Sequence, residues 1–131
     1  MKNVALFVDW DNLRNTLTFI QKRHSFKKFN FNDPLQLHYL FKSFLAKDEE
    51  IYRIYIYTAK MLTIQEIEER TFDKDRKKLE EWKKHYSSKY LHKLEISNKF
   101  LADIIKQDFV ALRLGKLSFR GFQNKHPIFI Q

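Results

Sequence analysis

The feature that most constrains the fold is a short apolar run near the amino terminus, residues 4–8 (VALFV), which ends abruptly in the polar stretch 9–12 (DWDN). An uninterrupted apolar run of this length is typical of a parallel strand that is buried on both faces. After it, apolar residues recur at helical spacing up to about Arg23, and either Asp11 or Asn12 can cap that helix at its amino end. The sequence therefore predicts a buried strand, an acidic turn and a helix.

Helices and strands continue to alternate along the chain. Asp33 is a good N-cap and Pro34 suits the first helical position, so a second helix is predicted there, and it closes over residues 47–50. Residues 51–59 are β-branched and aromatic almost throughout, which is the composition of a buried strand. A Thr63–Glu66 capping box predicts the start of a helical stretch that runs to about Tyr90, with a bend or break in its middle. A helix over 98–106, capped by Ser97, is predicted next. The last predicted elements are a strand over 109–121, with Gly115 as a bulge, and an apolar segment over 127–131.

Strands that alternate with helices indicate an α/β fold around a mostly parallel sheet. The chain has 131 residues, of which 44% are hydrophobic and only two are glycine, so we expect one globular domain over residues 1–131. There is no cysteine, which excludes disulfides and thiol catalysis. No apolar run is long enough to span a bilayer and no signal peptide is evident, so we expect a cytoplasmic protein without a membrane partner.

Two carboxylates follow the first predicted strand. Asp9 and Asp11 lie at its carboxyl end, where open α/β sheets build their sites, and Asn12 adds an amide. Two carboxylates can hold a hard cation such as Mg²⁺ or Mn²⁺, which activates water or stabilises charge during phosphoester cleavage. The same residues could instead cap the helix that follows, and the spacing alone leaves both interpretations open.

Three segments resemble one family. Residues 5–13 (ALFVDWDNL) resemble the opening motif of NYN domains, the PIN-like nuclease group that includes LabA-type proteins. Residues 54–59 (IYIYTA) resemble the second strand of that family, and residues 111–117 (ALRLGKL) resemble its R-L-G-x-L segment. The segments occur in the family's order, and the first motif is the most specific of the three.

The resemblance implies a Rossmann-like three-layer α/β/α sandwich of the PIN-like type and metal-dependent cleavage of RNA, with Mg²⁺ or Mn²⁺ as the cofactor. Asp9 takes the position of the family's first metal-binding aspartate and Asn12 that of its motif asparagine, with Asp11 as a further acid. We therefore expect Asp9, Asp11 and Asn12 to be the catalytic residues, and Asp9 and Asp11 to be the metal ligands.

The chain departs from the family pattern at its end. The family continues with a K-G-V-D and then a G-D-S-D segment, which supply further acids, and the sequence stops at Gln131, where the first would begin. Since two carboxylates on one turn seldom make a complete nuclease site, we expect a domain that lacks its carboxyl-terminal part and is catalytically incomplete. Whether this chain is an enzyme therefore stays open.

Two other classes of function remain open. A non-catalytic RNA-binding or interaction module would keep the fold and the basic surface. A haloacid-dehalogenase-like phosphatase also carries a D-x-D motif after an apolar strand, although that family has Thr or Val at the position of Leu13.

The charge indicates a polyanionic partner. Lys and Arg number 25 against 16 Asp and Glu, which gives a formal net charge of +9. Two basic groups are little compensated by acids, and aromatic residues beside the first suit single-stranded RNA. The expected phosphate contacts are Lys22, Arg23, Lys27 and Lys28 in the first group, and Arg113, Lys116, Arg120 and Lys125 in the second. An exposed sheet edge would also allow pairing with a second copy, which makes a homodimer a candidate state.

Overall fold

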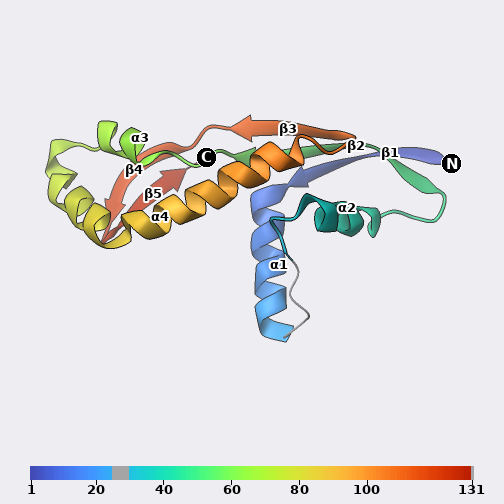
Figure 1. Ribbon diagram of the computed structural model, residues 1–131, viewed down its shortest axis with the longest axis horizontal. Coiled ribbons are helices and arrows are strands. Elements are labelled where there is room, and N and C mark those ends of the chain that lie inside the picture. Colours follow the sequence, from blue (N-terminus) through green and yellow to red (C-terminus); the bar gives the residue numbers. More distant parts are fainter. Residues whose placement is uncertain (25–29, 131) are drawn as a thin grey trace. The chain divides into compact units, whose positions relative to one another are not determined.

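The computed structural model describes residues 1–24 and 30–130, apart from the side chain of His24. Its elements are shown in Figure 1 and are β1 (Lys2–Asp9), α1 (Trp10–His24), α2 (Pro34–Lys42), β2 (Glu49–Ala59), α3 (Ile64–Glu69), the short 3-10 helix η1 (Asp73–Asp75), α4 (Arg76–Ile104), β3 (Val110–Gly115), β4 (Ser118–Gln123) and β5 (His126–Ile130). They form two compact units. The first holds β1, α1, α2, nearly all of β2, the last turns of α4 and β3, and the second holds α3, η1, the rest of α4, β4 and β5.

The first unit contains a three-stranded parallel sheet in the order β1-β2-β3 (Figure 1). Val8 pairs with Ile56 and Asp9 with Tyr57, so the carboxyl ends of β1 and β2 lie next to each other. This confirms the α/β class and the presence of strands at residues 4–8 and 51–59. The expected burial of the first strand on both faces is wrong, because Ala5 and Phe7 are exposed on one face. The strand pairing also places the turn after β1 beside the end of β2.

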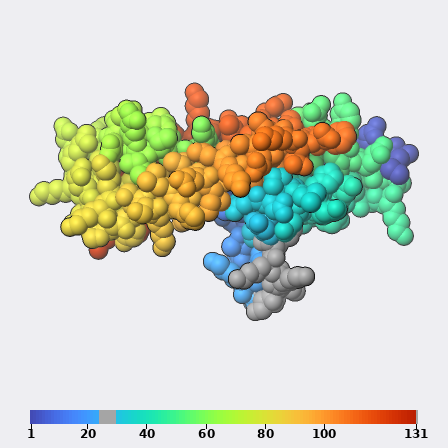
Figure 2. Space-filling view, viewed as in Figure 1, coloured from blue at the N-terminus to red at the C-terminus, as the bar shows by residue number. Residues whose placement is uncertain are grey.

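One face of this sheet is packed against helices. Val8, Ile54 and Ile56 point into a core whose other members come from α1, α2 and the end of α4. Figure 2 shows α2, in cyan, side by side with the orange segment that ends α4. Trp10, which is 2% exposed, stacks on Phe100 at 5.5 Å between ring centroids. Trp10 therefore packs in this core.

The other face of the sheet carries an aromatic and cationic stack. The rings of Phe7 and Tyr55 are nearly parallel at 5.0 Å, and the guanidinium of Arg113 lies 5.5 Å from the Tyr55 ring. One residue from each strand thus joins the stack, and Phe7 is 69% exposed. The described helices of this unit contribute to the core on the face of Val8, Ile54 and Ile56. A helical layer on the face of Phe7, which the expected three-layer sandwich requires, therefore stays a prediction.

The second unit has its own core, built between helices and an antiparallel hairpin. Ile67, Leu79, Trp82 and Phe122 are buried in it together with Leu62. The Thr63 capping box is present, since its hydroxyl accepts from the Glu66 backbone and its own N–H donates to the Glu66 carboxylate. The hairpin pairs β4 with β5 in antiparallel fashion, so the expectation of a mostly parallel sheet holds for the first unit alone.

Two predicted helix boundaries, the end near residue 90 and the start near residue 98, are wrong, whereas the predicted break in the charged stretch is confirmed. The break in the charged stretch falls between α3 and η1, after Arg70, and α4 then runs without interruption to Ile104. Ser97 therefore lies inside α4 and caps nothing. The helix continues through Ser97 because its apolar side chains remain buried on both sides of that residue, as Leu94, Leu101 and Ile104 show.

The long strand expected over 109–121 is divided into β3 and β4 at Lys116 and Leu117, and Gly115 simply ends β3. The bulge occurs at the other glycine. Between Phe119 and Phe122 the β4 strand has one residue more than its partner, and Gly121 has φ +91° there. This is the backbone conformation that glycine adopts most easily in a strand bulge.

None of the described helices is long and apolar enough to cross a membrane.

We expect Gly121→Ala to destabilise the protein by about 1–2 kcal/mol, because a side chain at positive φ is strained. An added Cβ would also lie 3.2 Å from the Asp75 carboxylate. The matched control is Gly115→Ala, whose φ is not positive. Urea unfolding followed by circular dichroism measures both variants, and equal stability for the two would contradict the role given to Gly121.

Tyr90 gives a pH-dependent prediction. Its hydroxyl donates to the Leu62 carbonyl at 2.7 Å, and burial, helped by the nearby Glu66 carboxylate, raises the pKa of Tyr90 to about 12. Since the ordinary pKa of tyrosine is about 10, the stabilisation is complete below pH 10 and is lost as the pH rises towards 12.

We expect Tyr90→Phe to cost about 1 kcal/mol at neutral pH through the lost hydrogen bond, and to remove the alkaline loss of stability between pH 10 and 12. It should also remove the latest step from the phenolate absorbance titration of the six tyrosines. If the step that Tyr90→Phe removes lies near pH 10 instead of near pH 12, Tyr90 ionises like an exposed tyrosine and the effect of burial is contradicted.

Candidate metal and nucleic-acid site

The candidate site lies where β1 passes into α1. Because α1 begins at Trp10, Asp9 is its N-cap residue. The backbone N–H of Asn12 donates to Asp9 Oδ1 at 3.4 Å, and the Asn12 side-chain amide donates to Asp9 Oδ2 at 2.5 Å. The N-cap is thus Asp9, and the prediction of Asp11 or Asn12 in that role is wrong by two or three residues. Asp9 is the better cap because its side chain can reach the free N–H at the third helical position.

Asp11 makes its contacts with the neighbouring strand. The Thr58 hydroxyl lies 3.0 Å from both Oδ1 and Oδ2 of Asp11, and Thr58 itself is only 4% exposed. This contact joins residues 47 positions apart in the sequence. It fixes the Asp11 carboxylate at the carboxyl ends of β1 and β2, the edge at which open α/β sheets bind ligands.

Asp9 and Asp11 therefore meet neutral partners. Within residues 1–24 and 30–130 neither carboxylate forms an ion pair with a lysine or arginine, although basic residues outnumber acidic ones by nine. The donors are an amide and a hydroxyl, and each carboxylate has about four acceptor positions, so acceptor capacity is left over. Two oriented, negatively charged groups at one sheet edge are chemically suited to a divalent cation.

The donor set fits a weakly held Mg²⁺ or Mn²⁺ better than a closed metal cage. Protein sites for Mg²⁺ commonly use one or two carboxylates and leave the other positions to water and substrate phosphates. Asp9 and Asp11 satisfy that minimum. Among the described residues no group of three or more histidines, aspartates and glutamates is gathered in a way that could hold a metal.

The predicted phosphate-binding residues are spread over several elements. Lys22 and Arg23 are exposed near the end of α1, and Lys27 and Lys28 lie outside the described residues. The second group belongs to both units: Arg113 lies on β3 in the first, and Lys116, Arg120 and Lys125 are exposed around the hairpin of the second. The described members of the first group thus lie in the first unit, and those of the second group are divided between the two units.

Sequence reasoning missed two sets of residues with a place in a site. Thr58 lies in the strand segment that resembles the family, and nothing in its local sequence reveals that its hydroxyl reaches Asp11. Lys89 and Lys93 line a groove of the second unit together with aromatic side chains. Their spacing of four residues, with Tyr86 and Tyr90 alongside, was the available signal.

No protein-family model, curated protein or solved structure matches the chain. The chemistry of the site therefore has to be argued from its own residues. The motif resemblance to NYN domains adds an expectation that these comparisons leave untested.

The two roles of Asp9 can be separated by substitution. Asp9→Ala removes the N-cap acceptor and should lower the free energy of unfolding by about 1 kcal/mol. Asp9→Asn keeps a good capping side chain and should lower it by a few tenths of a kcal/mol at most. Thermal unfolding of both variants measures the difference. If Asp9→Asn unfolds as easily as Asp9→Ala, the side chain of residue 9 does not act as the cap.

Thr58 gives a second prediction. Thr58→Val keeps the shape of the side chain but removes the donor to Asp11, so it should lower the free energy of unfolding by about 1 kcal/mol. Thr58→Ser retains the hydroxyl and should lose less stability. The free energies of unfolding of the two variants are the measurement. Equal stabilities for Val and Ser at this position would mean that the hydroxyl contributes nothing to holding Asp11.

Proposed function

We propose that the chain acts on RNA as an NYN-type, PIN-like ribonuclease domain, in which Asp9 and Asp11 hold a divalent cation. The observation that carries the proposal is the pair of carboxylates at the carboxyl ends of β1 and β2, each oriented by a neutral donor. Ordinary ion pairing does not account for these two side chains within the part of the chain that the structure describes. The net charge of +9 supports a polyanionic substrate.

The residues of the site have distinct roles in this proposal. Asp9 and Asp11 supply the charged oxygen ligands. Asn12 and Thr58 act as positioning residues, because their hydrogen bonds hold the carboxylates in place before any ligand arrives. A bound Mg²⁺ or Mn²⁺ would supply Lewis-acid activation of water and stabilise charge on the phosphate.

The fold that belongs to this proposal is the three-layer sandwich of PIN-like domains. Parallel sheets are as a rule covered on both faces. The exposed Phe7 and the Tyr55 ring stacked on it are the kind of surface that a further layer would cover.

A second candidate function is an RNA-binding module that does not cleave. It is favoured by one observation: among the described residues no three or more histidines, aspartates and glutamates are grouped so that they could hold a metal. Both candidates predict RNA binding, so cleavage distinguishes them.

The test uses the full chain with labelled single-stranded RNA in Mg²⁺ or Mn²⁺. The nuclease proposal predicts cleavage that chelator abolishes and that Asp9→Asn reduces at least a hundredfold, with RNA binding within about twofold of wild type. Asp73→Asn is the matched control, since Asp73 lies in η1 and should not affect cleavage.

Three other outcomes are informative. Binding without cleavage in any metal would select the RNA-binding module. Cleavage that survives both chelator and Asp9→Asn would contradict the assigned site. Release of phosphate from small phosphoesters, lost in Asp9→Asn, would instead favour the phosphatase class.

A further inference from the structure

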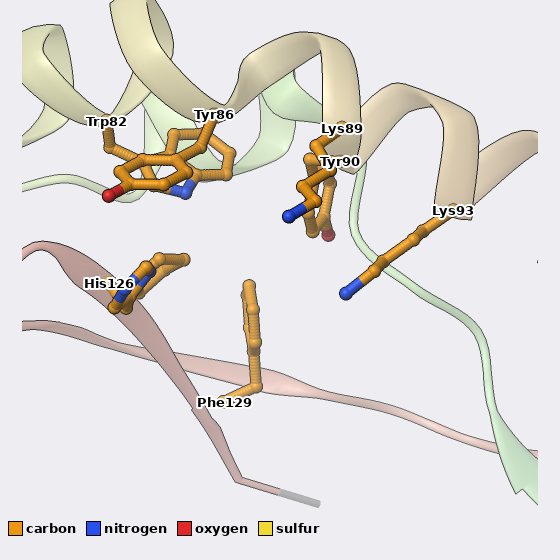
Figure 3. A pocket seen from close by; sticks show the side chains of 8 residues that line it. Trp82, Tyr86, Lys89, Tyr90, Lys93, His126 and Phe129 are labelled. Atoms are coloured by element: carbon orange, nitrogen blue, oxygen red, sulfur yellow. The ribbon is translucent and has the colours of Figure 1, made fainter.

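A groove in the second unit is lined almost entirely by aromatic and basic side chains. It has a volume of about 290 Å³, at the lower end of ligand-sized pockets, and is open to solvent. Figure 3 shows it between α4 and the hairpin, and its walls are Trp82, Tyr86, Lys89, Tyr90, Lys93, His126, Pro127 and Phe129. All of these residues belong to the same unit.

Two aromatic pairs border the groove. Tyr86 and His126 lie 5.0 Å apart between ring centroids, and Tyr90 and Phe129 lie 6.5 Å apart with an interplanar angle of 26°. Figure 3 shows open space between the two pairs, below Trp82. A planar, uncharged group such as a nucleobase can enter this space and stack on either pair.

The charges along the groove have one sign. Lys89 and Lys93 are exposed, point into its opening in Figure 3, and form no ion pair with the residues that the structure describes. No acidic residue lines it. Two other pockets of this unit differ in this respect, since Glu66 lines one of them and Glu81 the other.

We infer that this groove binds a nucleotide unit of single-stranded RNA, with the base among the aromatic rings and the flanking phosphates on Lys89 and Lys93. The inference rests on RNA as the partner in the proposed function, and it adds where the strand is held. Aromatic rings beside paired cations are the combination by which proteins bind single strands without reading sequence. An acidic peptide would use the lysines but would leave the aromatic rings without a role.

The first test is Lys89→Gln/Lys93→Gln, measured by fluorescence anisotropy with a labelled oligouridylate. Loss of two phosphate contacts should weaken binding about tenfold and reduce the slope of log affinity against log salt by about 1.4. Lys77→Gln/Lys84→Gln is the matched control, because it removes the same charge from exposed positions of α4 outside the groove. Equal losses in the two double variants would overturn the inference.

The second test addresses stacking. His126→Ala changes an exposed side chain, so the fold should survive, and loss of one stacking partner should weaken binding about fivefold or more. His92→Ala, an exposed histidine of α4 outside the groove, should have no effect. Polyglutamate that displaces the RNA as well as an oligonucleotide of equal charge would overturn the assignment of a base to the groove.

These outcomes are separable from the proposed function. If the groove variants bind RNA like the wild type while Asp9→Asn abolishes cleavage, the groove inference fails and the nuclease proposal stands. If the groove variants lose RNA binding and no cleavage is seen in any metal, the groove inference stands and the nuclease proposal fails. A wild-type chain that binds no oligonucleotide overturns both.

Discussion

The parallel pairing of β1 with β2 is the constraint on which the rest of the first unit depends. Parallel strands cannot be joined by a tight turn, so the chain must leave the end of β1, form α1 and α2, and return to start β2 at the same edge as β1. The pairing buries Val8 beside Ile56 and provides the surface on which the helices pack. The turn at the end of β1 then necessarily lies beside the end of β2.

That geometry explains the candidate site. Asp9 leaves the strand as the cap of α1, and Asp11, two residues later, faces the Thr58 hydroxyl of the adjacent strand. The contacts that stabilise the start of the helix therefore also orient two carboxylates at the edge of the sheet. Structural and functional roles are compatible here, because hydrogen bonds from Asn12 and Thr58 leave acceptor positions free on both acids.

Local signals in the sequence were sufficient for several elements. The apolar run of β1, the Asp33–Pro34 start of α2 and the Thr63–Glu66 capping box each depend on neighbouring residues, and all three are confirmed. The prediction of the cap of α1 is wrong because it depended on a choice between similar residues. Asp9, Asp11 and Asn12 are all capping types within four positions, so their order alone does not show where the helix starts.

Other features depend on contacts between distant parts of the chain. The bulge at Gly121 depends on how the flanking residues of β4 pair with β5. Ser97 stays inside α4 because apolar residues on both sides of it remain buried. The hydrogen bond from Thr58 to Asp11 likewise joins separate elements. The groove does so too, because Lys89 and Lys93 line it from α4 and Phe129 lines it from β5. Periodicity within one segment carries no information about such partners.

The central claim is that Asp9 and Asp11 hold one divalent cation. Titration of the full chain with Mn²⁺, followed by the electron paramagnetic resonance signal of the free ion, tests it without requiring catalysis. The account predicts that the wild type removes about one ion per chain from the free signal, and that Asp9→Asn and Asp11→Asn each weaken this binding at least tenfold while Asp73→Asn does not. Equal Mn²⁺ binding by all four proteins, or none by the wild type, would contradict it.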